Sequence, residues 1–145
     1  MEHWAAVTGA DAVLDTNVLV AALRSRQGAS WRILELVRLE EVRVHMTVPL
    51  ALEYEEVLLR HRKAAGWSRR ETLAFVGLLL RKAQRHKVYY LWRGHAKDSE
   101  DAHVLEAAIA AQVERLVTFN TGDFTGTDQL GIEVVTPGEF LRAIE

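Results

Sequence analysis

Short apolar segments alternate with helix-forming segments along the whole of this chain. The predicted strands are residues 12–14, 42–46, 87–92, 115–118 and 132–135. The predicted helices are residues 18–23, 30–38, 50–62, 69–84, a segment that begins at Asp98, and a terminal segment at Phe140. Strands that alternate with helices imply crossover connections, which place the helices on the faces of a parallel sheet. The pattern therefore predicts an α/β fold with a mainly parallel five-stranded sheet covered on both faces.

Several helix starts carry their own signals. Ser30 is a candidate N-cap for the second helix. Two segments have the spacing of a capping box, in which a hydroxyl residue is followed three positions later by a glutamate. They are Ser68 with Glu71, and Thr136 with Glu139.

The size and composition of the chain limit its class. With 145 residues and neither an internal repeat nor a linker, residues 1–145 are expected to form a single domain with a core at about 12–142. No apolar run approaches the roughly 18 residues that span a membrane, and the N-terminal segment lacks the pattern of a secretory signal. We therefore expect a cytoplasmic protein without a membrane partner. Because the chain has no cysteine, disulfides, thiolate metal sites and cysteine nucleophiles are excluded.

Acidic residues recur at equivalent places in the predicted sheet. Asp15 follows the first strand, and Asp123 lies just beyond the fourth. Glu53 is in the first turns of the helix after the second strand, and Asp98 and Asp101 open the helix that leads into the fourth. Strand carboxyl ends and the helix N-termini that follow them share one edge of a parallel sheet, where ligands bind. We therefore expect these carboxylates to face one crevice.

Carboxylates held close together repel each other, and a hard divalent cation relieves that repulsion. Mg²⁺ and Mn²⁺ prefer such oxygen ligands, and they can activate water and stabilise charge on a phosphodiester. The six histidines show no HxxxH spacing, so the pattern favours phosphoryl chemistry over zinc hydrolysis. Asn17 and Asn120 are neutral groups that could orient an acid or a ligand.

Each acid also has a purely structural interpretation. Asp15 could be a turn or capping residue that only ends the strand, and Asp98 could be only an N-cap. Glu53 has Glu55 and Glu56 as neighbours, and such a run of charge is usually a solvated helix face. Asp123 could be only a loop residue.

Several basic residues are expected to flank the crevice that the acids line. They are candidate contacts for RNA phosphates, although surface solubility explains them equally well. The set comprises Arg24, Arg26, Arg60, His61, Arg62 and Lys63. His103, on the helix that the acids open, is expected to be an ordinary core or surface histidine.

Four segments in order resemble the motifs of PIN domains. Residues 13–19 (Val-Leu-Asp-Thr-Asn-Val-Leu) resemble the opening motif, and Thr47 followed by Glu53 resembles the second. Residues 98–101 with 105–108 are similar to the third motif, and residues 116–124 to the fourth. Residues 136–141 resemble the ending of a PIN subgroup of toxin components from toxin–antitoxin pairs.

The resemblance implies a three-layer α/β/α sandwich with Mg²⁺- or Mn²⁺-dependent ribonuclease activity. It also implies a homodimer that is silenced by a small antitoxin protein. By position, the metal-site acids would be Asp15, Glu53, Asp101 and Asp123, with Asp98 instead of or beside Asp101. Thr16, Asn17, Thr118 and Asn120 would support them. Many relatives carry an acid at the position of Asn120, and here the next acid is Asp123.

The sequence thus predicts a metal-dependent endoribonuclease whose target is RNA. Of the basic residues, Arg24, Arg26, Arg60 and Arg62 are the predicted RNA contacts. An inactive PIN-like scaffold that binds RNA or a partner protein is the alternative. A nucleotide-binding or phosphotransfer protein is disfavoured, because the chain has neither a GxxxxGK[ST] loop nor a GxGxxG segment.

Overall fold

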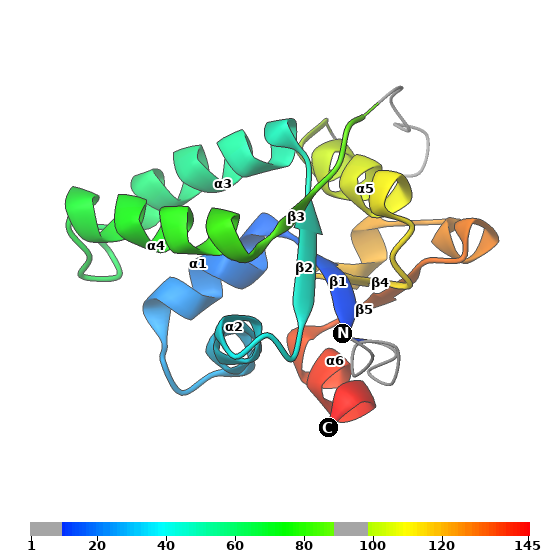
Figure 1. The fold of residues 1–145 in the computed structure, drawn as a ribbon, viewed down its shortest axis with the longest axis horizontal. Coiled ribbons are helices and arrows are strands. Elements are labelled where there is room, and N and C mark those ends of the chain that lie inside the picture. The colour runs from blue at the N-terminus through cyan, green and yellow to red at the C-terminus, as the bar shows by residue number, and fades with distance from the viewer. Residues whose placement is uncertain (1–9, 89–98) are drawn as a thin grey trace.

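A five-stranded parallel sheet lies at the centre of the protein (Figure 1). The computed structural model describes residues 10–88 and 99–145, without the side chains of residues 99 and 100. The strand order is β3-β2-β1-β4-β5, and every pairing is parallel. The strands are β1 (Asp11–Leu14), β2 (Arg43–Met46), β3 (Gln84–Arg85), β4 (Arg115–Val117) and β5 (Glu133–Val135).

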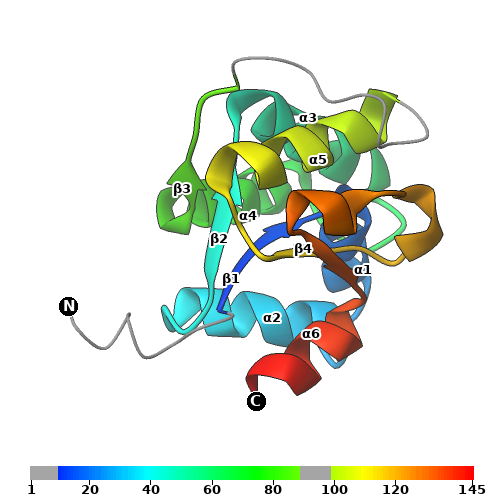
Figure 2. The ribbon, with the colours of Figure 1, turned by 90° about the vertical axis from the view of Figure 1, so that its right-hand side faces the viewer.

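Helices cover both faces of this sheet, which confirms the predicted α/β architecture. They are α1 (Thr16–Arg24), α2 (Ala29–Arg38), α3 (Val48–His61), α4 (Arg69–Lys82), α5 (Ser99–Ala111) and α6 (Pro137–Ile144). Figure 2 shows α5 on one side of the sheet and α2 with α6 on the other. The helices α3 and α4 lie side by side and extend away from the β2 side of the sheet (Figure 1).

The core explains why the central strands β1 and β4 are mostly apolar. Residues 12–14 of β1 are almost completely buried, as are Leu116 and Val117 of β4, because helices cover the sheet on both faces. On α5, small buried residues such as Ala107 and Ala108 let the helix lie close to β1, β2 and β4. Among the described residues, no helix has both the length and the apolar character that crossing a membrane requires.

The third strand was predicted in the wrong place. The sequence favoured residues 87–92, whereas β3 is formed by Gln84 and Arg85, which pair with His45 and Met46 of β2. The predicted helix over 69–84 ends earlier, at Lys82, so the strand follows it almost at once. Pairing with the free edge of β2 decides the position of this strand. Residues 89–92 lie outside the described residues.

The helix starts give mixed results. Both capping boxes form: in each, the hydroxyl residue and the glutamate accept each other's backbone N–H at 2.8–3.1 Å. Consequently the terminal helix begins at Pro137, one turn before Phe140. The prediction for Ser30 is wrong, because Gly28 is the N-cap of α2 and Ser30 is buried inside the helix.

Candidate active site

Asp15 occupies the junction between β1 and α1. Its backbone N–H donates to the Val117 carbonyl oxygen (2.8 Å), and its Oδ1 accepts from the Thr16 N–H at 2.7 Å as the N-cap of α1. Its Oδ2 accepts from Thr118 Oγ1 (2.7 Å) and from Asn17 Nδ2 (3.3 Å). The residue is only 6% exposed. The carboxylate is therefore held in one orientation, at the carboxyl edge of the sheet.

Burial raises the pKa of Asp15 above its ordinary value of 3.8. The negative charges of Glu53 and Asp123 raise this pKa further, whereas the hydrogen bonds from Thr118 and Thr16 lower it. Glu53 and Asp123 are thus close enough to act on Asp15 electrostatically. A cation placed among these carboxylates would relieve both the repulsion and the desolvation.

Glu53 lies in the second turn of α3 and links three helices. The hydroxyl of Thr47, the N-cap of α3, accepts from the Leu50 N–H at 3.3 Å, which fixes the start of the helix. Glu53 Oε2 accepts from Thr16 Oγ1 of α1 at 2.6 Å, and Oε1 lies 2.9 Å from His103 Nδ1 of α5. Its neighbours on α3, Glu55 and Glu56, are exposed to solvent. Within this run of acids, only Glu53 turns toward Asp15.

The loop after β4 is tied to the same network. Asn17 Oδ1 accepts from the Phe119 N–H at 3.3 Å, and Asn17 Nδ2 donates to Thr118 Oγ1 at 3.3 Å. Thr118 Oγ1 also accepts from the Asn120 N–H at 3.0 Å. These bonds hold the loop that carries Asp123 against the end of β1.

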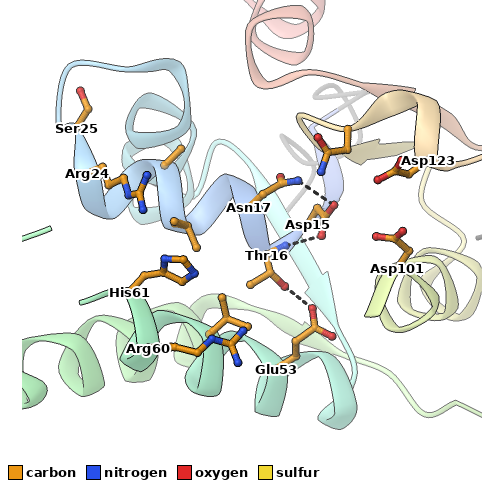
Figure 3. A pocket seen from close by; sticks show the side chains of 14 residues that line it. Asp15, Thr16, Asn17, Arg24, Ser25, Glu53, Arg60, His61, Asp101 and Asp123 are labelled. Atoms are coloured by element: carbon orange, nitrogen blue, oxygen red, sulfur yellow. Dashed lines mark hydrogen bonds between the residues drawn. The ribbon is translucent and has the colours of Figure 1, made fainter. Parts of the chain in front are cut away.

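Asp101 and Asp123 approach Asp15 from two further elements. Asp101 is in the first turn of α5, and Asp123 ends the short 3₁₀ helix η3 (Thr121–Asp123). Figure 3 shows both side chains on the side of Asp15 that faces away from α1, with Glu53 below. Asp98, the other candidate for the third acid, lies outside the described residues.

The four acids line one cleft with a volume of about 720 Å³. At its other end the cleft is lined by Arg24, Ser25, Arg60 and His61, and apolar side chains of α1 and α3 lie between the two ends. Among residues 10–88 and 99–145, no three acidic or histidine side chains stand close enough to enclose a metal ion. The four acids therefore share a cleft without forming a closed cluster among the described residues.

The comparison with protein families matches the PIN domain over residues 11–122. The chain belongs to the PIN domain family. Comparison with curated protein sequences found no match. Among solved structures, the fold is similar to one in the crystal structure of VapBC2 from Rickettsia felis bound to a DNA fragment from their promoter, with a TM-score of 0.57 and 14% identity. That similarity covers 86% of this chain and 96% of the other.

The departure of this PIN domain from the fourth motif has a local explanation. Asn120 stands at the position where the resemblance leads us to expect an acid, and its side chain also lines the cleft. The single turn of η3 that follows carries Asp123 into the cleft three positions later. The cleft thereby keeps a carboxylate from this loop.

The predicted RNA-contact residues of this PIN domain separate into two pairs. Arg24 and Arg60 line the cleft. The Arg26 guanidinium instead lies 5.4 Å from the ring centre of Trp31 and 6.0 Å from that of Trp67, and Arg62 Nη1 donates to the Trp67 carbonyl oxygen at 3.2 Å. The second pair is engaged in packing α1 and α2 against the α3–α4 turn.

His103 is the site residue that sequence reasoning missed. It was expected to be an ordinary core or surface histidine, yet its Nδ1 contacts Glu53. The sequence did contain a hint of this role, because His103 lies two positions after Asp101 in the first turns of α5. The contact itself depends on how α5 packs against α3, which no local pattern records.

Proposed function

We propose that this PIN domain is a Mg²⁺- or Mn²⁺-dependent endoribonuclease and the toxin of a toxin–antitoxin pair. The observation that carries the proposal is the buried Asp15 carboxylate, whose pKa is raised and which shares a cleft with Glu53, Asp101 and Asp123. PIN domains are generally nucleases that use divalent metals. A cleft with acids at one end and arginines at the other suits a phosphodiester substrate.

The donor set of the cleft fits a hard divalent cation. All four acids offer oxygen ligands, and Mg²⁺ binds proteins through one or two carboxylates while keeping several waters. Asp15, Glu53, Asp101 and Asp123 would hold it, with Asp98 as a further candidate. When bound there, such an ion supplies a Lewis acid that activates water and stabilises the charge of the phosphodiester.

The protein's own groups orient these acids. Thr118 and Asn17 donate to Asp15 Oδ2, which keeps the carboxylate from turning away from the cleft. The Thr16 hydroxyl and the His103 ring hold the two oxygens of Glu53. No side-chain nucleophile is required, because the attacking group in this proposal is water. Supporting groups of this kind fix ligand orientation and raise metal affinity.

The toxin assignment rests on resemblance and on fold. The C-terminal motif resembles that of PIN toxins, and the similar fold comes from VapBC2 bound to promoter DNA. The partners in this proposal are an RNA substrate, a small antitoxin protein and a second copy of the chain, all in the cytoplasm. Exposed apolar residues on the α3–α4 pair, such as Leu52 and Leu78, offer area for a protein interface.

An inactive RNA- or protein-binding scaffold is the second candidate. The observation that favours it is Asn120, an amide at the position where the family resemblance leads us to expect an acid. If the remaining carboxylates hold no metal, the cleft still offers cations and hydrogen-bonding groups to a ligand.

Cleavage of a mixed RNA pool tests the proposal. We expect cleavage with Mn²⁺, none with EDTA, and a loss of at least about 100-fold with Asp15→Asn. Glu53→Gln should behave like Asp15→Asn, whereas the matched control Glu55→Gln, an exposed acid on the same helix, should retain activity. RNA that is bound but left intact under all these conditions would support the scaffold instead.

A further inference from the structure

The basic end of the cleft has no role in holding the acids. Arg24, Arg60 and His61 lie in the last turns of α1 and α3, whereas Asp15 and Glu53 lie near the starts of the same helices. Figure 3 shows Arg24 and His61 directed toward each other across the cleft, with Arg60 beside them. The two helices thus run side by side from the carboxylates to this group, which we call the distal cation cluster after its two arginines.

Helix geometry gives the separation between the two ends. From Asp15 to Arg24 the chain advances along α1 by about 14 Å, and from Glu53 to Arg60 along α3 by about 10 Å, at about 1.5 Å per residue. A stacked nucleic-acid strand advances about 3.4 Å per nucleotide, so this backbone length corresponds to no more than about three or four nucleotides, because long side chains on a helix lean toward its N-terminus. One direct salt bridge or hydrogen bond cannot connect the two ends, but a nucleotide strand can.

The charges in the distal cation cluster are available to a ligand. Among the described residues, no hydrogen bond or ion pair engages the Arg24 guanidinium, and Arg24 is exposed. Arg60 has only the exposed Glu56 at 3.9 Å, an i,i+4 pair of the kind that contributes little. Arg26 and Arg62 differ, because both contact Trp67.

Helix C-termini attract cations even without a ligand, which is the competing explanation of the cluster. Two features of the cluster are not explained by this helix C-terminus effect. The cations of two different helices converge on one cleft, and that cleft continues to the carboxylates. Val20, Ala21 and Val57 line the stretch between the two ends, which leaves a surface without charge on which a nucleoside can lie.

We propose that Arg24, Arg60 and His61 form a phosphate subsite for a single-stranded RNA substrate, about three or four nucleotides from the bond that is cut. This inference rests on the proposed function and deepens it, because it sets a minimum substrate length and fixes the path of the strand between α1 and α3.

RNA binding tests the subsite separately from cleavage. In an Asp15→Asn background with Mn²⁺, fluorescence anisotropy would follow labelled oligouridines of two to eight nucleotides at several salt concentrations. Arg24→Ala should weaken binding of the longer oligomers about tenfold and reduce the salt slope by about 0.7, the value for one phosphate contact on a single strand. Binding of the dinucleotide, which is too short to reach the cluster, should be unchanged. Arg70→Ala, a distant exposed arginine, is the matched control.

The outcomes separate the two proposals. A length-dependent loss with Arg24→Ala and Arg60→Ala supports the subsite, even for a protein that never cleaves RNA. Intact cleavage with unchanged binding in both variants overturns the subsite and leaves the nuclease in place. The subsite is also overturned if Arg24→Ala weakens the binding of oligouridines of every length equally. If Arg24→Ala weakens binding of a hexaglutamate peptide but not of RNA, the cluster serves an acidic protein partner and the proposal is wrong.

Discussion

Asp15 combines a structural and a functional demand in one side chain. As the N-cap of α1 it accepts a backbone N–H, which favours the charged form at a helix start. Burial and the negative charges of Glu53 and Asp123 destabilise the charged form of Asp15. The net effect is a raised pKa, so the charged form of Asp15 is less favourable in the metal-free fold than in the unfolded chain.

The stability of an Asp15→Asn variant follows from that raised pKa. Protonated Asp15 favours the fold, so its contribution is complete below about pH 3.8 and is lost as the pH rises through the folded pKa. Asparagine caps helices about as well as aspartate and carries no charge. In EDTA, the melting temperature of the variant relative to that of the parent should therefore be higher by a few degrees at pH 7 than at pH 4. Thermal melts at both pH values measure this, and an equal difference would contradict the account.

Thr118 should matter more to metal binding than to folding. Its hydroxyl donates to Asp15 Oδ2, so Thr118→Val removes a group that favours the ionised carboxylate. We expect about tenfold weaker Mn²⁺ binding by calorimetry. The control is Thr72→Val, which loses a buried hydroxyl that donates to the Ser68 carbonyl oxygen at 2.9 Å, away from the cleft. Thr72→Val should lose about 1 kcal/mol of stability. Comparable Mn²⁺ affinity in the two variants would refute the role of Thr118.

His103 should position Glu53. His103→Ala leaves Glu53 with only the Thr16 hydroxyl, and we expect Mn²⁺ affinity to fall by about tenfold. His103→Gln keeps an N–H donor and should recover part of that loss. If alanine and glutamine variants bind Mn²⁺ as the parent does, the contact between His103 and Glu53 has no functional role.

At the scale of elements, two helix caps provide a matched comparison. Thr47 caps α3, which carries Glu53, whereas Ser68 caps α4, which lines no part of the acidic cleft. Thr47→Ala and Ser68→Ala should each cost about 1 kcal/mol in chemical denaturation. Only Thr47→Ala should also reduce RNA cleavage, because it loosens the turn that holds Glu53. Equal activity in the two variants would show that the cap does not position this acid.

The elements that could be predicted from sequence are those that local chemistry decides. The capping boxes at Ser68 and Thr136 formed as expected, because the hydroxyl and glutamate that make them are three residues apart. The third strand was misplaced because its position depends on the edge of β2, more than 35 residues away in sequence. Local β propensity carries no information about such a partner.

At the scale of the whole molecule, the cleft follows from the order of the elements. Every strand is parallel, so the strand ends and helix starts that carry Asp15, Glu53, Asp101 and Asp123 meet at one edge. This convergence was predicted from sequence. The sequence did not predict the contact between His103 and Glu53. Nor did it predict that Arg24 and Arg60 line the cleft while Arg26 and Arg62 do not. Both depend on packing between helices that are distant in sequence.

The most direct test of the account is calorimetric titration of Mn²⁺ into the protein and into four amide variants. These are Asp15→Asn, Glu53→Gln, Asp101→Asn and Asp123→Asn. If the four acids form one metal site, the parent binds Mn²⁺ and every variant binds it at least about tenfold more weakly. A parent that binds no Mn²⁺, or an Asp15→Asn variant that binds it as the parent does, would contradict the central claim.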